Sequence, residues 1–471
     1  MLNNTMFRQV ALMGFVTMLA SPSRLSSGYQ ALVRILITAP LILFTLTILV
    51  GCSGGNDQPG TGASSNTSRG QPPAVVAETL PLLSITTSSG AEITSKEDYA
   101  PAQYRLTSET GQLLQNGNLD IRGRGNSTWE MPKKPYRLRL ASSTPTLDMP
   151  ANRHWVLLAN YSDKTLIRND VAFELSRRVG MEYTPRSRYV ELQLNGTDRG
   201  IYQLTEHIRI DPNRVNIPEL KIGDTSPDLI TGGYLIEIDF RRGEDYCYES
   251  PRTGIIFCLS NPETLLEPGW ENQRAYIEGY LAQTEDAIFS DRFTDPTVGY
   301  AAYLDVDSMI NFYLIAEWLK NVDSNLGSSV YLHKKRNGKL TFGPIWDFDL
   351  SIGNVDFKEA DGLDAGATDG WYVRSASWFT RLFQDPAFET KVKARWNQLK
   401  ASGVLEDMFT YIDQQSRWLS KVQANNFTIW DILGIYVWPN RVVTGSYEGE
   451  VAAMKAWLRE RTNWMDAQLG Q

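Results

Sequence analysis

The sequence predicts an α+β fold in which mixed short sheets precede a helical C-terminal part. Tyr136, Leu138 and Leu140 alternate with arginines, which is typical of a half-buried strand. The segment Tyr447–Leu469 instead carries apolar residues at helical spacing. Strands and helices follow one another irregularly and no repeat is evident, so we expect an α+β class rather than a regular α/β class.

The strands are expected mainly in the first half of the domain. Residues 80–140 have the composition of several short strands. A hairpin is expected over Tyr189–Ile208, because Asn195-Gly196 between two apolar runs is a strong turn signal. No second low-complexity linker follows, so residues 80–471 are expected to form one continuous domain, with its helical part beginning at about residue 400.

Two earlier helices are expected within this domain. Leu166–Val179 has a helical pattern and is followed by Gly180, a common residue at a helix end. Asp305 or Asp307 is expected to cap a second, apolar helix over Ser308–Lys320.

The N-terminal region is typical of an export signal. Arg24 and Arg34 precede the apolar run Ile35–Val50, which ends in small residues before Cys52. Residues 1–51 are therefore predicted to be a lipoprotein-type signal, and Cys52 is predicted to be acylated and to tether the chain to a membrane. The alternative is a transmembrane anchor, for which the run is short. Residues 52–79 are expected to be a flexible linker, and the domain is expected to lie outside the cytoplasm at the cell envelope.

Two further cysteines, Cys247 and Cys258, lie in the predicted domain. In an exported chain they are expected to form a disulfide, and two buried free thiols are the alternative.

Acidic residues gather at both ends of a predicted hairpin within Asn321–Gly353. With Asn337-Gly338 as the centre of the turn, Asp347 lies opposite Ser328. Asp347 and Asp349 then lie beside the loop that carries Asp323 and Asn325. Such a set of oxygen ligands fits Mg²⁺-assisted phosphoryl transfer, while ordinary turn chemistry is the alternative for Asp323 and Asn325.

Basic residues on a glycine-containing loop are candidates for phosphate contacts. Arg122 and Arg124 alternate with glycines and precede Asn126, so guanidinium and backbone N–H groups can approach a phosphate. A tight turn with exposed arginines is the alternative.

In the predicted strands, Lys134 and Glu206 each occupy a position on the same face as neighbouring apolar residues. A buried carboxylate requires a cation, which Lys134, Arg122 or Arg168 is expected to supply. A solvated lysine is the alternative for Lys134.

Several functions are disfavoured. The formal net charge of −8 argues against a nucleic-acid partner. The three histidines lack the spacing of zinc ligands, and no G-x-S-x-G elbow occurs.

Several motifs, in order, resemble the spore coat protein H (CotH) kinase family. They are IRGRGNSTWEMPKKPYRLRL, HWVLLANYSDKTLIRNDVAFELSRRVG, YVELQLNGTDRGIYQLTEHI, GGYLIEID, NVDSN and GPIWDFDLSIGN. The resemblance implies an atypical protein-kinase-like fold that transfers phosphate from ATP, with Mg²⁺ or Mn²⁺, to serine or threonine residues of a protein substrate.

The resemblance also suggests roles for individual residues. Asp323 resembles the catalytic aspartate and Asp347 the metal-binding aspartate, with Asp349 beside it. Asn325 is a second metal ligand on physical grounds. The remaining expected nucleotide contacts are Arg122, Arg124, Asn126, Arg168, the supporting pair Lys134 and Glu206, and Trp346, which is expected to stack on adenine or to belong to the core.

The chain also departs from ordinary protein kinases. No HRD motif occurs, Asn325 follows Asp323 by only two residues, and WDFD replaces DFG. Because ATP is scarce outside the cytoplasm, a non-catalytic surface binding module on the same fold is the main alternative function, and an envelope hydrolase is a third.

Overall fold

The computed structural model describes residues 79–243 and 245–470, which belong to one compact unit. The predicted export signal, Cys52 and all of the predicted linker except residue 79 lie outside these residues. Within the described ranges, no helix is both long and apolar enough to cross a membrane.

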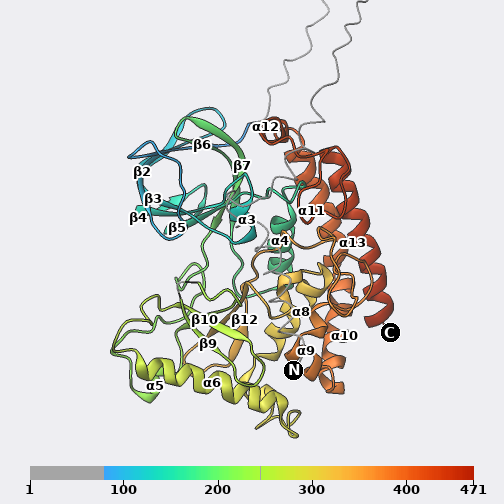
Figure 1. Cartoon of the computed structure of the whole chain (residues 1–471). Coiled ribbons are helices and arrows are strands. Elements are labelled where there is room, and N and C mark those ends of the chain that lie inside the picture. The colour runs from blue at the N-terminus through green and yellow to red at the C-terminus, as the bar shows by residue number, and fades with distance from the viewer. Residues whose placement is uncertain (1–78, 244, 471) are drawn as a thin grey trace, which may run out of the picture. The chain divides into compact units, whose positions relative to one another are not determined.

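The first third of the unit is a closed seven-stranded barrel (Figure 1). Around the barrel the strands run in the order β1-β2-β3-β4-β5-β7-β6, and only the closing β1–β6 pair is parallel. Alternate residues point inward, so the interior is filled by side chains such as Ile85, Leu138 and Trp155. The strands are β1 (Leu82–Thr87), β2 (Ala100–Thr107), β3 (Leu113–Gly123), β4 (Tyr136–Thr146), β5 (Met149–Leu158), β6 (Ser187–Leu194) and β7 (Thr197–Glu206).

A second, antiparallel sheet of five strands follows the barrel in the chain, in the order β12-β11-β8-β10-β9. Its strands are β8 (Tyr234–Ile238), β9 (Tyr246–Glu249), β10 (Ile256–Asn261), β11 (Val330–Lys334) and β12 (Leu340–Phe342). Cys247 and Cys258 face each other across β9 and β10 and are joined by a disulfide.

Helices pack against this sheet and against one another, and Figure 1 shows the last ones gathered along one side. The described helices are α3 (Ser127–Glu130), α4 (Arg168–Val179), α5 (Pro227–Ile230), α6 (Glu271–Phe289), α7 (Tyr300–Tyr303), α8 (Val306–Trp318), α9 (Ser377–Leu382), α10 (Pro386–Ala401), α11 (Val404–Leu419), α12 (Gln423–Ile429) and α13 (Tyr447–Leu469). The α+β class is thus confirmed. The helical part begins at α9, earlier than predicted.

Three predicted elements are found with small shifts. Gly180 ends α4 in a left-handed conformation, with φ +85°. Asp305 caps α8 by accepting a hydrogen bond from the Ser308 N–H at 3.0 Å. The hairpin over 189–208 forms as β6 and β7.

The register predicted for the β11–β12 hairpin is wrong by one residue. His333 pairs with Thr341 and Lys334 with Leu340, so the turn is centred on Asn337 itself, which has φ +55°. A shift of one residue moves side chains to the other face of a sheet. Asp347 nevertheless lies close to the start of β11, since the hydroxyl of Ser329, directly before β11, donates to its Oδ2 at 3.4 Å.

Candidate active site

Two loops, each carrying a predicted acidic residue, are joined by backbone hydrogen bonds. The one-turn 3-10 helix Val322–Ser324 follows α8 and carries Asp323. The Ile352 N–H donates to the Leu319 carbonyl at 2.7 Å, and the Asn321 side-chain amide donates to the Asp347 carbonyl at 3.1 Å. The Asp323 loop is therefore held against the loop that begins at Asp347.

Asp347 lies at the centre of an acidic cluster, which we define as Asp239, Asp323, Asp347 and Asp349. Asp347 has φ +63°, a left-handed conformation that is uncommon for an aspartate. Ser329 donates a hydrogen bond to its Oδ2 at 3.4 Å. Besides burial, the charge of Asp347 raises the pKa of each of the other three carboxyl groups, so each of them lies within electrostatic reach of Asp347.

The other carboxyl groups of the cluster bind protons more tightly than usual. Burial, followed by the charge of Asp347, raises the pKa of Asp323 to about 7, although Arg241 opposes this shift. Asp349 is only 7% exposed. Burial and the charges of Asp347, Asp323 and Asp163 raise its pKa well above the usual range. Like-charged groups held together in this way indicate a functional site.

Sequence reasoning missed two acidic residues, Glu237 on β8 and Asp239 directly after it. Burial and Asp239 raise the pKa of Glu237 to about 8, and burial also raises the pKa of Asp239. The signal was present in the motif GGYLIEID, where carboxylates occupy alternate positions at the end of an otherwise apolar strand.

Arg241 connects the acidic cluster with the glycine-containing loop, and it too was missed. Its guanidinium faces Asp239 at 3.5 Å and donates to the Ser328 hydroxyl. With its amide oriented to satisfy both groups, Asn126 accepts from this guanidinium at 3.2 and 3.3 Å. Asn126 thus lies beside Arg241, which in turn faces Asp239 of the acidic cluster.

Arg124 also lies at this site, but Trp346 does not present a free face. The Arg124 guanidinium lies 5.4 Å from the Trp346 ring centre, and the Phe173 ring lies at 6.0 Å. The indole is 5% exposed. Trp346 therefore has the core role that was the alternative to adenine stacking.

The glycines of the loop are required for packing. A Cβ at Gly123 would lie 2.3 Å from the Trp129 ring, and one at Gly125 would lie 2.2 Å from the Thr128 hydroxyl. Arg122 is directed elsewhere: it donates to the Lys96 carbonyl at 2.6 Å and lies over the Tyr99 ring.

Arg168 supports the Asp347 loop and contacts neither Glu206 nor a free surface. Its guanidinium is buried, pairs with Asp163 at 2.5 Å and donates to the Ser351 carbonyl at 3.0 Å. The neighbouring Asn169, which sequence reasoning also missed, accepts from the Phe348 N–H at 2.7 Å. The start of α4 thus fixes the backbone on both sides of Asp349.

The predicted Lys134–Glu206 pair is wrong. Glu206 is buried and accepts hydrogen bonds from Arg186 at 3.0 and 3.1 Å. Lys134 donates to the Trp129 carbonyl. Lys133 is the buried lysine, and it donates to Asn426 at 2.8 Å. The alternation of side chains along β4 does not extend back to Lys134, because Pro135 interrupts it before β4 begins.

The donor set suits a cation only in part. Within residues 79–243 and 245–470, no three acidic, histidine or cysteine side chains form a ready-made metal site. Proteins commonly bind Mg²⁺ through one or two carboxylates together with substrate phosphates and waters. The Asn325 side chain points along its own loop. Its Oδ1 lies 2.9 Å from the position that a Cβ on Gly327 would occupy.

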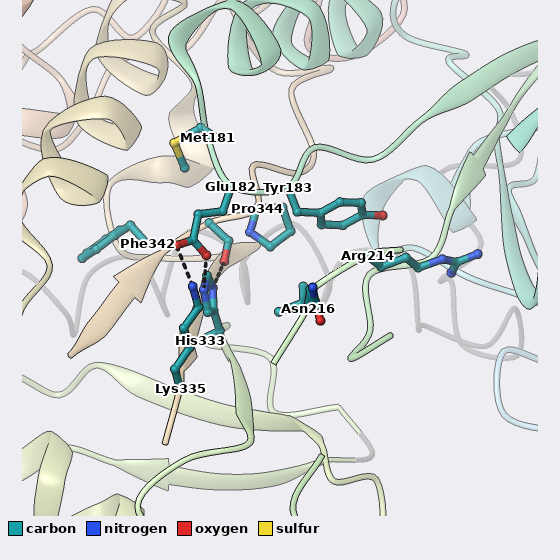
Figure 2. A pocket seen from close by; sticks show the side chains of 11 residues that line it. Met181, Glu182, Tyr183, Arg214, Asn216, His333, Lys335, Phe342 and Pro344 are labelled. Carbon is teal, nitrogen blue, oxygen red and sulfur yellow. Dashed lines mark hydrogen bonds and ion pairs between the residues drawn. The ribbon is translucent and has the colours of Figure 1, made fainter. Parts of the chain in front are cut away.

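A separate cavity of about 200 Å³ contains none of the predicted site residues. Figure 2 shows Glu182 reaching His333 and Lys335, at 3.2 and 2.8 Å. Because Glu182, His333 and Lys335 are already paired with one another, this cavity is a weaker candidate for the active site. It is lined by Met181, Glu182, Tyr183, Arg214, Val215, Asn216, His333, Lys335, Phe342, Gly343 and Pro344.

Comparison with known proteins gives the family. A search of the curated proteins found no match to the chain. A model of the family described as CotH kinase protein matches residues 121–465, which include the glycine-containing loop, β8 and the whole acidic cluster. Because this match covers most of the chain, the protein belongs to the CotH kinase protein family.

Proposed function

We propose that the chain is an atypical protein kinase that transfers phosphate from ATP to serine or threonine hydroxyls of a protein, with Mg²⁺ or Mn²⁺ as cofactor. The observation that carries this proposal is the acidic cluster around Asp347, set beside Arg124, Asn126 and Arg241. Carboxylates suit a divalent cation, and guanidinium and amide groups suit phosphate oxygens.

Asp347 and Asp349 are the proposed ligands of the metal, with Asn325 as a further ligand. A bound divalent cation would neutralise negative charge on the phosphates during transfer. Burial and neighbouring carboxylates raise the pKa of Asp349, and a bound cation would lower it again by favouring the ionised carboxylate.

Asp323 is the proposed proton acceptor for the substrate hydroxyl. Its pKa of about 7 is close to the value expected for a base that works near neutral pH. Arg124 and Asn126 would orient the phosphates, and Arg241, which now faces Asp239 and Asn126, would contribute positive charge at the same place.

The kinase-like interpretation of the fold and the tether also belong to this proposal. The barrel and the second sheet would be the two lobes that enclose the nucleotide, and acylation of Cys52 would hold the domain at the envelope. The substrate would then be a serine- or threonine-containing protein that can reach this surface.

The test is transfer from γ-labelled ATP by the full-length chain, with Mg²⁺ or Mn²⁺, to itself and to a serine-rich protein. Label that disappears in both Asp323→Asn and Asp347→Asn supports the proposal. Asp291→Asn, at an exposed aspartate far along the chain from the cluster, is the matched control. Unchanged labelling in both variants, or no labelling with either metal, would contradict it and favour a non-catalytic binding module.

A further inference from the structure

A second group of charged side chains lies where the chain leaves the barrel. We define the cationic hinge cluster as Arg137, His154, His207, Arg209 and Arg214. Arg137 lies on β4 and His154 on β5, while the other three lie on the segment that follows β7. None of these residues was assigned a role from the sequence.

Short contacts join the members of this cluster. The ring centres of His154 and His207 are 6.3 Å apart, and Arg214 donates to the His207 carbonyl at 2.5 Å. Arg137 and Arg209 approach the same carboxylate oxygen of Glu263, at 3.7 and 3.5 Å. Two strands of the barrel, the connecting segment and the turn after β10 thus meet here.

Positive charge exceeds negative charge in the cluster. Glu263 is shared between two guanidiniums and is itself 52% exposed. Arg214 lies 3.8 Å from Glu206, but that carboxylate is already bonded to Arg186. Asp211 also faces Arg214 and accepts from Asn152 at 3.2 Å, and Arg153 adds a further cation near His154.

Buried nitrogen atoms in the cluster have no hydrogen-bond partner among the described residues. They are Nε of Arg137, Nη2 of Arg214 and Nδ1 of both histidines. Figure 2 shows the Arg214 guanidinium pointing away from the Glu182–His333 contact, so that contact does not satisfy it. Buried polar groups are nearly always bonded to protein or to a bound species. Burial and the neighbouring arginines lower the pKa of both histidines, which an added negative charge would reverse.

We infer that the cationic hinge cluster binds a phosphate-type oxyanion at a site separate from the acidic cluster. A tetrahedral oxyanion accepts several hydrogen bonds at once, and guanidinium groups bind it through paired donors. The shared chemistry is a phosphate group, which free phosphate or a phosphoserine side chain can supply.

The separation of the two sites follows from the second sheet. Ile210 of the connecting segment donates through its N–H to Asn261 at 3.3 Å, and Asn261 pairs with Leu235 at the start of β8. Asp239 follows the opposite end of β8, four residues further on, or about 13 Å at strand spacing. A bound oxyanion would tie the barrel to the connecting segment and to the turn after β10.

The chain contains only three histidines, which permits a direct test by NMR. In the full-length chain, the imidazole signals of His154 and His207 are followed while inorganic phosphate is added. Both signals are expected to shift saturably, and their pKa values are expected to rise. The His333 signal is the internal control and is expected to remain in place, because His333 is bonded to Glu182 and to the Gly343 carbonyl.

Matched variants define the ligands. Arg137→Gln and Arg209→Gln are each expected to weaken phosphate binding about tenfold or more, as expected for loss of one charge-assisted hydrogen bond. Arg139→Gln is the control, because this arginine lies two residues further along β4 and pairs with Asp120 at 2.8 Å. Equal shifts of all three histidines, no saturation, or equal loss in the control variant would overturn the inference.

Two further titrations identify the source of the anion and its independence of phosphoryl transfer. A phosphoserine peptide that binds more tightly than phosphate assigns the site to phosphorylated protein, and equal or weaker binding assigns it to the free anion. Phosphate binding is expected to persist in Asp347→Asn, even if that variant shows the proposed function to be wrong. Displacement of the phosphate by Mg²⁺-ATP would overturn the separation of the sites.

Discussion

The acidic cluster and the buried pair Glu317–Arg461 show two ways in which this domain keeps charge inside. Both side chains of the pair are 0% exposed and lie 2.7 Å apart. The remaining donors and acceptors are also matched: Glu317 accepts from the Tyr372 and Arg374 N–H groups, and Arg461 donates to the Thr368 and Gly370 carbonyls. Such a pair joins α8 to α13, and its charges are balanced without a bound ligand.

Asp323 of the acidic cluster lies only a few residues after Glu317, but the cluster has the opposite character. Burial and the charge of Asp347 raise the pKa of both Asp323 and Asp349, and Arg241 is the cation that opposes this at Asp323. A buried charge that is matched contributes to a specific structure, whereas like charges held together indicate a site whose counter-ion arrives with the ligand. Substitutions in the two regions should therefore have opposite consequences.

The largest effect on stability is expected for Arg461→Met, which leaves Glu317 buried without its cation. Loss of one partner from a buried pair costs about 3–5 kcal/mol, measured as the free energy of unfolding in urea. Arg459→Met, on the same helix, removes an exposed pair with Glu406 and is expected to cost under about 1 kcal/mol. Equal losses in the two variants would remove the contrast between matched and exposed pairs.

Asp347→Asn is expected to act on function and not on folding. Removal of the central carboxylate should lower phosphoryl transfer at least about 100-fold, as is typical when a key electrostatic group of an active site is lost. Its free energy of unfolding should stay equal to wild type or increase, because the substitution removes the repulsion between residue 347 and the other carboxylates. A variant that unfolds more easily and transfers phosphate normally would contradict both expectations.

Asn169→Ala tests whether the start of α4 holds the active-site loop. The Phe348 N–H would lose its acceptor while remaining buried, which costs about 1–3 kcal/mol. Activity is expected to fall together with stability, because the backbone around Asp349 is no longer fixed. Asn213→Ala, at an exposed asparagine, is expected to change neither quantity.

The pH dependence of stability tests the raised pKa values of the acidic residues themselves. The pKa values of Asp323 and Glu237, about 7 and about 8, exceed those of the unfolded chain. The folded state therefore binds more protons, so their contribution is present below about pH 4 and is lost as pH rises towards about 8. Urea unfolding of Asp323→Asn should depend less on pH across this window than wild type. A parallel dependence in the two proteins would show that Asp323 is not perturbed.

The sequence predicted the fold class, the α4, α8 and α13 helices and the region of the acidic cluster, because these depend on local periodicity and nearby turns. It did not predict the barrel, because the parallel β1–β6 pair joins Leu82 to Glu191 over a long separation. Nor did it predict the hairpin register, which depends on where Asn337 adopts a positive φ.

The predicted side-chain partners were wrong where the alternation of a strand was extended across an irregular segment. Because Pro135 interrupts the alternation, Lys133 is buried in place of Lys134. The cation that pairs with Glu206 is Arg186, which lies just before β6 begins. Glu237 and Asp239 were readable as carboxylates on an apolar strand, but their proximity to Asp347 required the pairing of β8 with β11.

Binding of Mn²⁺ in the presence of a non-hydrolysable ATP analogue, followed by electron paramagnetic resonance, tests the acidic cluster most directly. Wild type is expected to bind the ion only when the nucleotide analogue is present, because proteins usually hold Mg²⁺ or Mn²⁺ through one or two carboxylates together with the phosphates of the nucleotide. Binding should be lost in Asp347→Asn and retained in Asp291→Asn. Binding of equal strength in both variants, or the same binding without nucleotide, would contradict the assignment of this cluster as a metal–nucleotide site.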